Sequence, residues 1–315
     1  DGGAPRTLAW LRSCGIPATT GHDPAHLENA DWAIFSPALQ PGHPECAAAE
    51  KQGIPLYRRG RVLPVLAEMW KTVAVSGTHG KTTTSSMVAH IQRRCGVDAS
   101  WCIGGELPPD GAPAGVGASD WLVIEADESD GTLAHYVPEI AVITNIEFDH
   151  MEHFASPEAM VDCFRAFAQQ ARAVIYCADD PEAARIGVAA NGISYGFSPD
   201  ANFRATSLEP VRQGTRFAVY APGGRIAAVP LPLPGRHNVL NALAAIAAAE
   251  RCGIGLEAAC GALASFALPR RRFEPVAEAR GIRVIADYAH HPTEIRALID
   301  AARQAGAGRI WAVFQ

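Results

Sequence analysis

The segment 77–84 reads Gly-Thr-His-Gly-Lys-Thr-Thr-Thr, and its residue types suit a nucleoside triphosphate. A glycine-bearing turn lets backbone N–H groups approach phosphate oxygens, and a helix N-terminus behind it adds a favourable dipole. Lys81 then reaches the β- and γ-phosphates, and the Thr82 hydroxyl ligates Mg²⁺. The usual P-loop pattern would begin with a glycine where this sequence has Val75, so the loop departs from the general form. We predict a triphosphate site here, with a chance Gly-Lys-Thr turn as the alternative.

Carboxylates follow a second apolar run, Trp121–Glu125, which continues as Ala-Asp-Glu-Ser-Asp to Asp130. The carboxyl edge of a parallel sheet is where α/β folds bind their ligands. Because Mg²⁺ prefers one or two carboxylates together with phosphate oxygens, Glu125 is a candidate metal ligand. Asp127 and Asp130 fit a solvated acidic turn equally well.

A third apolar run, Ile140–Thr144, ends in Asn-Ile-Glu-Phe-Asp-His, which closes at His150. A lone histidine is more often structural. Here, however, three polar strand ends are expected to converge on one edge of the sheet, which favours His150 as a second metal ligand.

Two later motifs also carry polar side chains. Pro-Gly-Arg-His-Asn, residues 234–238, introduces an Ala-rich stretch and offers Asn238 as an N-cap, with polar groups near a phosphate or base; capping alone would explain the asparagine. The adjacent histidines His290 and His291 precede Pro292 in an expected strand-to-helix turn. Packing does not explain them easily, so we predict a ligand role.

These residues need a strand–helix framework to position them. A β-rich run at 72–76 leads through the glycine loop into a helical pattern that continues to Cys95. Apolar strands alternating with helical segments such as 157–172 predict a mostly parallel, doubly wound α/β sheet. Besides the run at 72–76, the expected strands are Trp121–Glu125, Ile140–Thr144 and Ala173–Cys177.

The flanking regions have other patterns. Short runs at 32–36 and 54–56 predict a small α/β unit before the main sheet. Between 203 and 234, alternating runs with Gly and Pro turns predict antiparallel strands packed on the main sheet, and 238–251 predicts a buried helix. After a boundary near Leu268, the runs RVIADY and RIWAVF resemble the first strands of another α/β unit.

Composition limits the classes of protein. The chain has 315 residues, 48% hydrophobic and 19% charged, with a net charge of −6, which is typical of a globular protein and argues against nucleic acid or an anionic membrane as the main partner. The sequence holds no apolar run of about 18 residues. Eight cysteines without a CxxC pair predict buried thiols in a reducing compartment. The sequence opens at Asp1 without methionine and stops just after a strand-like run, so we expect both ends to be cut.

Taken in order, GTHGKTTT, EADESD, NIEFDH, GRHNVLNALAA, RRRFE and DYAHHPTEI resemble the Mur ligases, the ATP-dependent amide-forming enzymes of peptidoglycan precursor synthesis. The resemblance covers nearly the whole chain. It implies a three-domain architecture around a central P-loop ATPase domain with a mostly parallel sheet and a small antiparallel sheet. We expect a UDP-sugar-binding domain over 1–70 with its start missing, the central domain over 71–267, and an incomplete C-terminal ligase domain over 268–315.

The resemblance also implies roles for individual residues. Lys81 would hold the β- and γ-phosphates, Thr82 and Glu125 one Mg²⁺, and Glu125 with His150 a second. Lys81, His150, His290 and His291 would be catalytic. The residues implied to bind the nucleotide are Gly77, Thr78, His79, Gly80, Lys81, Thr82, Thr83, His237, Asn238, Arg271, Asp287 and Tyr288, with Arg272 beside Arg271 at the hinge.

One position separates branches of the family. Many sister ligases carry a carbamylated lysine where this chain has Arg165, and 151–172 contains no lysine. This favours the branch that adds L-alanine to UDP-N-acetylmuramate in the cytoplasm through an acyl phosphate. Phe148 favours instead the recycling branch that attaches a whole tripeptide, whereas Met151, Tyr288 and the short connection 130–138 favour the alanine branch.

Two readings outside this branch stay open: a P-loop NTPase or kinase without ligation, and a nucleotide-binding protein whose catalytic set has decayed. The oligomeric state is not predicted.

Overall fold

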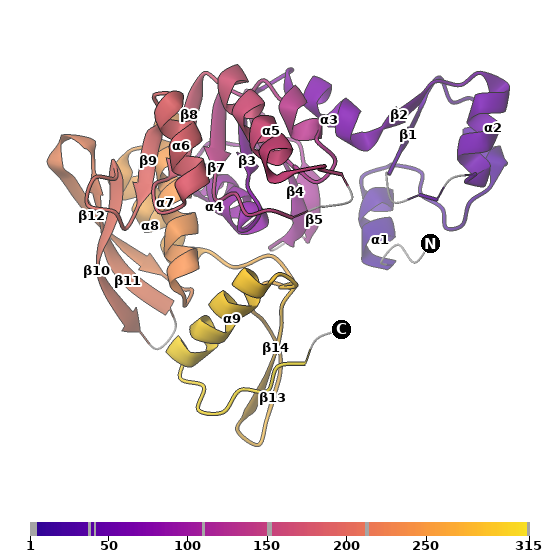
Figure 1. Ribbon diagram of the computed structural model, residues 1–315. Coiled ribbons are helices and arrows are strands. Elements are labelled where there is room, and N and C mark those ends of the chain that lie inside the picture. Colours follow the sequence, from indigo (N-terminus) through magenta and orange to yellow (C-terminus); the bar gives the residue numbers. More distant parts are fainter. Residues whose placement is uncertain are drawn as a thin grey trace. The chain divides into compact units, whose positions relative to one another are not determined.

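The computed structural model describes residues 5–36, 39–40, 42–108, 111–149, 153–211 and 214–313. The chain divides into two compact units, Asp1–Leu66 and Ala67–Gln315 (Figure 1).

The first unit is the predicted small α/β unit. Its two strands pair in parallel, with Ala33 opposite Leu56, and a helix connects them. Helix α2 ends at Gly53, whose φ of 70° is the left-handed conformation that commonly stops a helix. The elements are α1 (Pro5–Ser13), the 3₁₀ helix η1 (Pro24–Leu27), β1 (Ala33–Phe35), α2 (Pro44–Gln52) and β2 (Leu56–Arg58), followed by α3 (Arg59–Ala67).

Within the described residues, the second unit is built on one sheet of ten strands in the order β12-β11-β10-β9-β8-β7-β3-β6-β4-β5. In this spatial order, the neighbouring pairs from β9 to β4 are all parallel, which confirms the predicted mostly parallel sheet. The strands are β3 (Lys71–Ser76), β4 (Ser100–Leu107), β5 (Ala112–Gly115), β6 (Trp121–Glu125), β7 (Ile140–Ile143), β8 (Ala173–Cys177), β9 (Ile193–Gly196), β10 (Phe203–Val211), β11 (Gly214–Ala221) and β12 (Arg225–Leu231).

The antiparallel strands β10, β11 and β12 form where the sequence predicts them, but they continue the main sheet instead of packing on its face. The first residues of β10 pair in parallel with β9, Phe203 opposite Tyr195 and Arg204 opposite Gly196. Their hydrogen bonds therefore extend the sheet edge. Phe217, Val219 and Val229 are buried and join the core.

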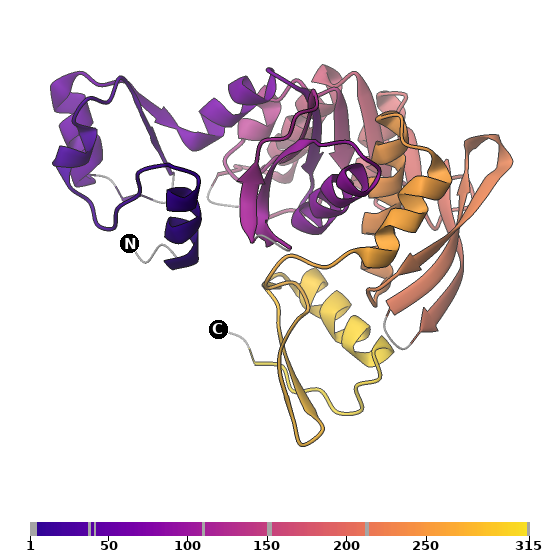
Figure 2. The same cartoon turned by 180° about the vertical axis from the view of Figure 1, so that it is seen from behind.

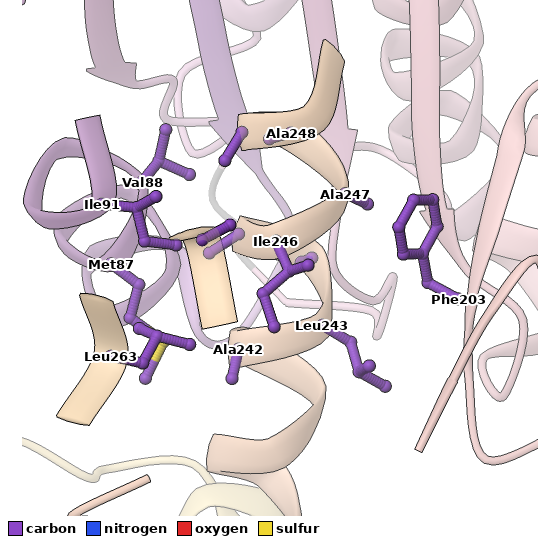
Figure 3. Close-up of a cluster of buried hydrophobic side chains, with 14 of the residues drawn as sticks. Met87, Val88, Ile91, Phe203, Ala242, Leu243, Ile246, Ala247, Ala248 and Leu263 are labelled. Carbon is purple, nitrogen blue, oxygen red and sulfur yellow. The ribbon is translucent and has the colours of Figure 1, made fainter. Parts of the chain in front are cut away.

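Helices cover both faces of the sheet (Figure 2). The helices α4 (Lys81–Arg94), α7 (Arg236–Arg251) and α8 (Leu256–Ala262) lie together on one face, and α5 (Pro157–Gln170) and α6 (Pro181–Ala189) lie together on the other. The predicted buried helix is α7. Its small alanines let α4 approach closely, so that Met87, Ile91 and Ile246 pack in one fully buried cluster (Figure 3). Short 3₁₀ turns lie at Thr132–His135, Pro222–Gly224 and Leu263–Ser265.

The last part of the chain holds the antiparallel pair β13 (Glu274–Ala279) and β14 (Ile282–Ala286) and then helix α9 (Pro292–Gln304). The prediction of a strand in RIWAVF is wrong for residues 309–313, which form no strand in the described part of the chain. A strand needs a neighbour to take its backbone hydrogen bonds, and β14 pairs only with β13 among the described strands.

All eight cysteines are free thiols. Cys163, Cys177 and Cys260 are buried as predicted, and burial raises the pKa of the Cys177 and Cys260 thiols to about 12, so they stay protonated. Cys14, in contrast, is exposed. No helix of the described residues combines the length and the apolar character that crossing a membrane requires.

Candidate active site

The loop between β3 and α4 packs closely against the end of β7. Gly77 has a φ of +135°, and a Cβ at that position would lie 2.0 Å from Thr144 Oγ1 and 2.9 Å from the Asn145 carbonyl oxygen. Gly80, with a φ of +84°, is the N-cap of α4, and its Cβ would lie 2.6 Å from Asn241 Oδ1. Both glycines are therefore required by close contacts as well as by backbone conformation.

We expect Gly77→Ala to lower the free energy of unfolding by about 1–3 kcal/mol more than Gly96→Ala. Gly96 also has a φ of +84° but no atom within 4 Å of a Cβ, so the control measures the strain of a positive φ without the clash. Denaturant unfolding of the two variants makes the comparison. Equal losses would contradict the close packing of the loop on β7.

The end of β7 holds the loop through an amide clamp. The His79 N–H donates to Asn145 Oδ1 at 2.8 Å, and Asn145 Nδ2 donates to the His79 carbonyl at 2.9 Å. Thr78 Oγ1 donates to the Glu147 carbonyl and accepts from the Glu147 N–H, both at 2.9 Å. The loop is thus preorganised by residues of the Asn-Ile-Glu segment. Sequence reasoning placed that segment at the sheet edge but gave Asn145 and Glu147 no role.

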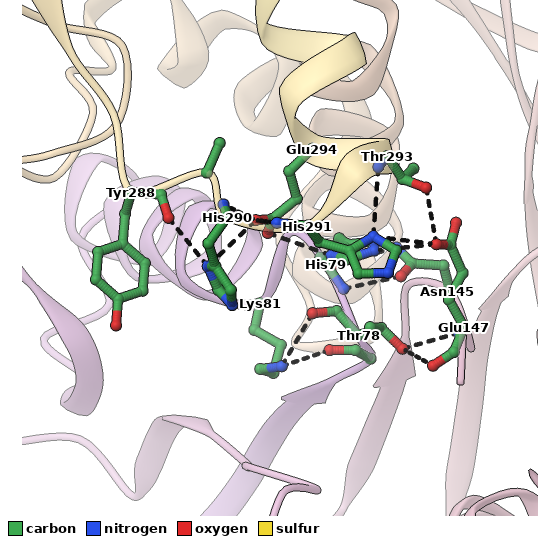
Figure 4. A network of polar contacts seen from close by, with 12 residues as sticks. Thr78, His79, Lys81, Asn145, Glu147, Tyr288, His290, His291, Thr293 and Glu294 are labelled. Atoms are coloured by element: carbon green, nitrogen blue, oxygen red, sulfur yellow. Dashed lines mark hydrogen bonds and ion pairs between the residues drawn. The ribbon is translucent and has the colours of Figure 1, made fainter. Parts of the chain in front are cut away.

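Lys81 begins α4, and its ammonium group folds back over the loop (Figure 4). Lys81 Nζ donates to the Gly77 carbonyl at 2.7 Å and to the Thr78 carbonyl at 3.2 Å, and it pairs with Glu128 Oε1 at 2.8 Å. The Glu128 side chain is fully buried, so this is a buried ion pair. Glu128 belongs to the predicted acidic motif but was not singled out in it.

Two of the predicted Mg²⁺ ligands meet. Thr82 Oγ1 donates to Glu125 Oε1 at 3.1 Å, and the Gly104 N–H donates to Glu125 Oε2 at 2.8 Å. A hydroxyl beside a carboxylate is the hard oxygen donor set that Mg²⁺ prefers, so the residues fit the ion. His150, the third predicted ligand, lies outside the described residues.

The hydrogen bonds of Asp127 and Asp130 fit the alternative interpretation, an acidic turn. Asp127 accepts from the N–H and hydroxyl of Ser129, and Asp130 accepts from the N–H of Thr132 at 3.1 Å. These bonds within the turn explain both carboxylates without a ligand.

A cavity of about 290 Å³ opens beside the loop. Its lining comes from the loop, from the ends of β7 and β8, from the start of α7, from the hinge segment 268–273 and from α9. Gly80 and Thr83 line it from the loop and the start of α4, and Thr293 and Glu294 line it from α9. The cavity therefore places the phosphate loop against residues more than 200 positions later in the chain.

His237 and Asn238 both line this cavity. Burial lowers the pKa of His237 although Asp287 and Glu294 act to raise it, so its ring is neutral at pH 7. The prediction that Asn238 caps α7 is wrong. The helix begins at Arg236 with Gly235 as its N-cap, and Asn238 Nδ2 instead donates to the Pro234 carbonyl at 2.7 Å.

At the hinge, the two arginines differ. The Arg271 side chain is exposed, and its backbone N–H donates to Glu274 Oε2 at 2.9 Å. Arg272 lines the cavity, its guanidinium donates to Thr82 Oγ1 at 3.4 Å, and it lies 5.6 Å from the Tyr288 ring centroid. Arg272 is therefore the arginine that reaches the loop.

Among the residues following β14, Asp287 lines the cavity and accepts from the N–H groups of Phe273 and Ala289. Tyr288 is more than half exposed. The exposed His290 places Nδ1 3.1 Å from the Tyr288 carbonyl oxygen. The two adjacent histidines thus differ in exposure, because the His290 side chain is largely in solvent and the His291 side chain is mostly buried.

His291 belongs to a polar group that we call the α9 cluster, formed by His79, Glu147, His291, Thr293 and Glu294 (Figure 4). Glu147 Oε2 accepts from Thr293 Oγ1 at 2.8 Å and lies 3.3 Å from His79 Nε2 and 3.4 Å from His291 Nδ1. Glu294 Oε1 lies 3.2 Å from His79 Nδ1. His291 is also the N-cap of α9, with Glu294 completing a capping box. The cluster holds the start of α9 against the phosphate loop.

The α9 cluster predicts a pH dependence. Burial alone would raise the pKa of Glu294, but hydrogen bonds from His79 and the His290 N–H lower it to about 2. Burial alone would lower the pKa of His79, but Glu294 and Glu147 raise it above 6.5. The Glu294 contribution is present above its ordinary pKa of 4.5 and is lost as the pH falls towards 2. The His79 contribution is complete below 6.5 and is lost as the pH rises through its raised pKa.

We therefore expect the difference in melting temperature between the unchanged chain and Glu294→Gln to be largest between pH 4.5 and 6.5. It should shrink at higher and at lower pH. Glutamine retains the capping box, so the variant removes mainly the charge. A difference that does not change with pH would contradict the ion pair between His79 and Glu294.

In comparisons with known proteins, family models match nearly the whole chain. Residues 5–71 match the family model described as Mur ligase family, catalytic domain; residues 75–249 match the Mur ligase middle domain; residues 271–315 match the Mur ligase, glutamate ligase domain. Curated relatives named UDP-N-acetylmuramate–L-alanine ligase include one from Gloeobacter violaceus, 41% identical over 97% of this chain and 66% of the relative. Another, from Kineococcus radiotolerans, is 43% identical over 98% of this chain and 68% of the relative.

Solved structures agree. The UDP-N-acetylmuramate-alanine ligase of Thermotoga maritima superposes with a TM-score of 0.84 at 30% identity, covering 94% of this chain and 69% of that one. A murein peptide ligase from Psychrobacter arcticus gives a TM-score of 0.77 at 27% identity, covering 97% and 70%. The chain spans about two thirds of the length of the proteins it matches. Sequence motifs, fold and matched domains together show that this chain belongs to the Mur ligase family.

Proposed function

We propose that this chain carries the nucleotide site of an ATP-dependent ligase that joins L-alanine to the lactyl carboxylate of UDP-N-acetylmuramate in peptidoglycan precursor synthesis. The observation that carries the proposal is the cavity lined by both the phosphate loop and α9, because a nucleotide there would contact both. The names of relatives that are about 40% identical to the chain support the choice of substrates.

In the proposed reaction, the lactyl carboxylate attacks the γ-phosphorus of ATP, which forms an acyl phosphate and releases ADP. The amine of L-alanine then attacks the acyl carbonyl, phosphate leaves, and the amine loses its proton. Phosphorylation is needed because the alternative leaving group from a carboxylate would be oxide. The first step brings an anion to a polyanion, so it requires positive charge at the transferring phosphoryl group.

Lys81 supplies that charge in the proposal. Its ammonium group is anchored on two loop carbonyls and on buried Glu128, so it is fixed before the nucleotide binds. Such fixed charge costs no reorganisation during the reaction. Arg272, which reaches Thr82 from the hinge, adds a second cation beside the same phosphates. His290 and His291 are proposed to act from the closing C-terminal segment.

Thr82 and Glu125 would hold Mg²⁺, and Glu125 with His150 would hold a second ion. When bound, Mg²⁺ neutralises phosphate charge and acts as a Lewis acid at the γ-phosphoryl group. Arg272 contacts Thr82, so the hinge and the proposed metal site are linked directly.

The α9 cluster would close the site over the acyl phosphate. It connects the phosphate loop to α9 through Glu147, Thr293 and His79. Closure excludes water, which would otherwise hydrolyse the acyl phosphate before alanine attacks. His237 and Asn238, which line the cavity, would lie beside the nucleotide.

We further propose three domains over 1–70, 71–267 and 268–315. The matched family domains, 5–71, 75–249 and 271–315, support similar divisions. We propose a cytoplasmic location, where ATP is available and the eight free thiols stay reduced.

The choice of amine is tested with the full-length protein. Phosphate release is measured with ATP, Mg²⁺ and UDP-N-acetylmuramate, together with L-alanine, the tripeptide or no amine. Release that depends on L-alanine, with the matching amide seen by mass spectrometry, is expected. Release only with the tripeptide would transfer the chain to the recycling branch, and release without any amine would indicate a simple NTPase.

A further inference from the structure

Three histidines and a glutamate gather in the first unit, far along the sequence from the phosphate loop. His26 lies in η1 and His22 lies just before it, while His43 and Glu45 lie at the start of α2. One ligand atom each from His22, His43 and Glu45 lie within 4.8 Å of one another. Imidazole nitrogens with one carboxylate oxygen are a donor set that suits zinc and similar transition metals.

The glutamate divides its two oxygens between different partners. Glu45 Oε1 accepts from His26 Nδ1 at 2.7 Å and from the Asp23 N–H at 3.3 Å. Glu45 Oε2 faces His22 Nδ1 at 3.2 Å and His43 Nδ1 at 4.0 Å. Glu45 Oε1 is thus held by His26 and the Asp23 N–H, as outer partners hold the carboxylate ligands of metal sites. Glu45 Oε2 faces the other two imidazoles and is within hydrogen-bonding distance of His22 Nδ1.

The distances suit a small cation. Ligands bonded at about 2.0–2.1 Å in a tetrahedron are about 3.3 Å apart. The separation of 3.2 Å between His22 Nδ1 and Glu45 Oε2 is already of that size, and the separation of 4.0 Å from His43 needs only a small shift.

His43 points to a bound ligand independently of the distances around Glu45. Its side chain is only 9% exposed, and within the described residues neither of its ring nitrogens has a hydrogen-bond partner. Its ring lies edge-on to His22, with centroids 4.3 Å apart. His43 is the N-cap of α2 but makes no side-chain capping bond, so capping does not explain the residue. A buried imidazole without a hydrogen-bond partner is costly unless a ligand takes a lone pair.

Buried apolar side chains lie on the same two elements. Leu27 on η1 and Ala49 on α2 are buried, and these elements, which carry the cluster, pack on each other.

We propose that His22, His43 and Glu45 form a binding site for a zinc-class divalent cation that joins η1 to the start of α2, with His26 orienting Glu45. Three protein ligands leave one tetrahedral position for water. Because two donors are nitrogen, Mg²⁺ should not compete.

The test titrates the full chain with Zn²⁺ against a chromophoric chelator, and with Co²⁺, whose visible spectrum reports tetrahedral nitrogen and oxygen ligands. His79, Glu147 and His291 also offer ligand atoms within 4.8 Å, so all titrations use a His291→Ala background. We expect one equivalent to bind, in the presence of millimolar Mg²⁺, and to raise the melting temperature.

His43→Ala and His22→Ala should each weaken binding at least about 100-fold, and His26→Ala about 10–100-fold. The matched control His135→Ala, at an exposed histidine outside every cluster, should leave the affinity unchanged. Circular dichroism checks the fold of each variant, and His22, with a side chain 36% exposed, serves as ligand variant if His43→Ala unfolds. Equal Zn²⁺ affinity in folded His22→Ala and in the control would overturn the site.

Discussion

Replacing Lys81 with methionine is expected to lower the rate of amide formation by about 10³-fold or more, measured as phosphate release by the full-length protein. The ammonium group is the fixed charge nearest the loop that would hold the phosphates, and removal of one such preorganised group typically costs about 10²–10³ in rate. The loss should appear in kcat, because the charge is needed most as the phosphoryl group transfers.

The ion pair with Glu128 makes a second control necessary. The Glu128 side chain is fully buried, so removing its lysine partner should destabilise the chain by about 3–5 kcal/mol. The double variant Lys81→Met/Glu128→Gln removes both charges and should recover much of the stability without recovering activity. Lys71→Met, at an exposed pair with Asp120, should leave both unchanged. Unimpaired turnover in Lys81→Met would contradict the assigned role.

Replacing Glu125 with glutamine is expected to lower turnover by about 10²–10³-fold and to raise the Mg²⁺ concentration that gives half-maximal activity. The substitution preserves size and removes the negative charge that faces Thr82. The readout is a series of Mg²⁺ titrations at saturating ATP.

The matched control is Asp127→Asn, at an exposed carboxylate of the same motif that accepts from the N–H and the hydroxyl of Ser129. Its Mg²⁺ dependence should not change. If Glu125→Gln and Asp127→Asn behaved alike, Glu125 would not be a metal ligand.

Much of the framework follows from local sequence signals. The strands β3, β6, β7 and β8 are uninterrupted apolar runs bounded by polar residues, so their places are predicted to within a residue or two. The strand β4 was not predicted, because Gly104 and Gly105 interrupt it and its burial does not alternate regularly. The predicted strand in RIWAVF depended on a partner strand that local pattern does not reveal.

The residues of the candidate site also differ in how well the local sequence predicts them. The loop glycines, Lys81, Thr82 and Glu125 carry a recognisable spacing, and the structure brings Thr82 and Glu125 together. Glu147 and Glu294 act through partners far away in the chain, so no local pattern marks them. The choice of Arg272 over Arg271 as the arginine that reaches the loop likewise depends on the backbone, since Arg271 has a φ of +60° and turns its side chain to solvent.

The formation of an acyl phosphate is the central claim, and isotope transfer tests it most directly. UDP-N-acetylmuramate labelled with ¹⁸O in its lactyl carboxylate is turned over by the full-length protein with ATP, Mg²⁺ and L-alanine, and the released phosphate is analysed by mass spectrometry. The proposal predicts one labelled oxygen in each phosphate released, together with ADP and one amide product. Unlabelled phosphate, released with or without the amide, would contradict it.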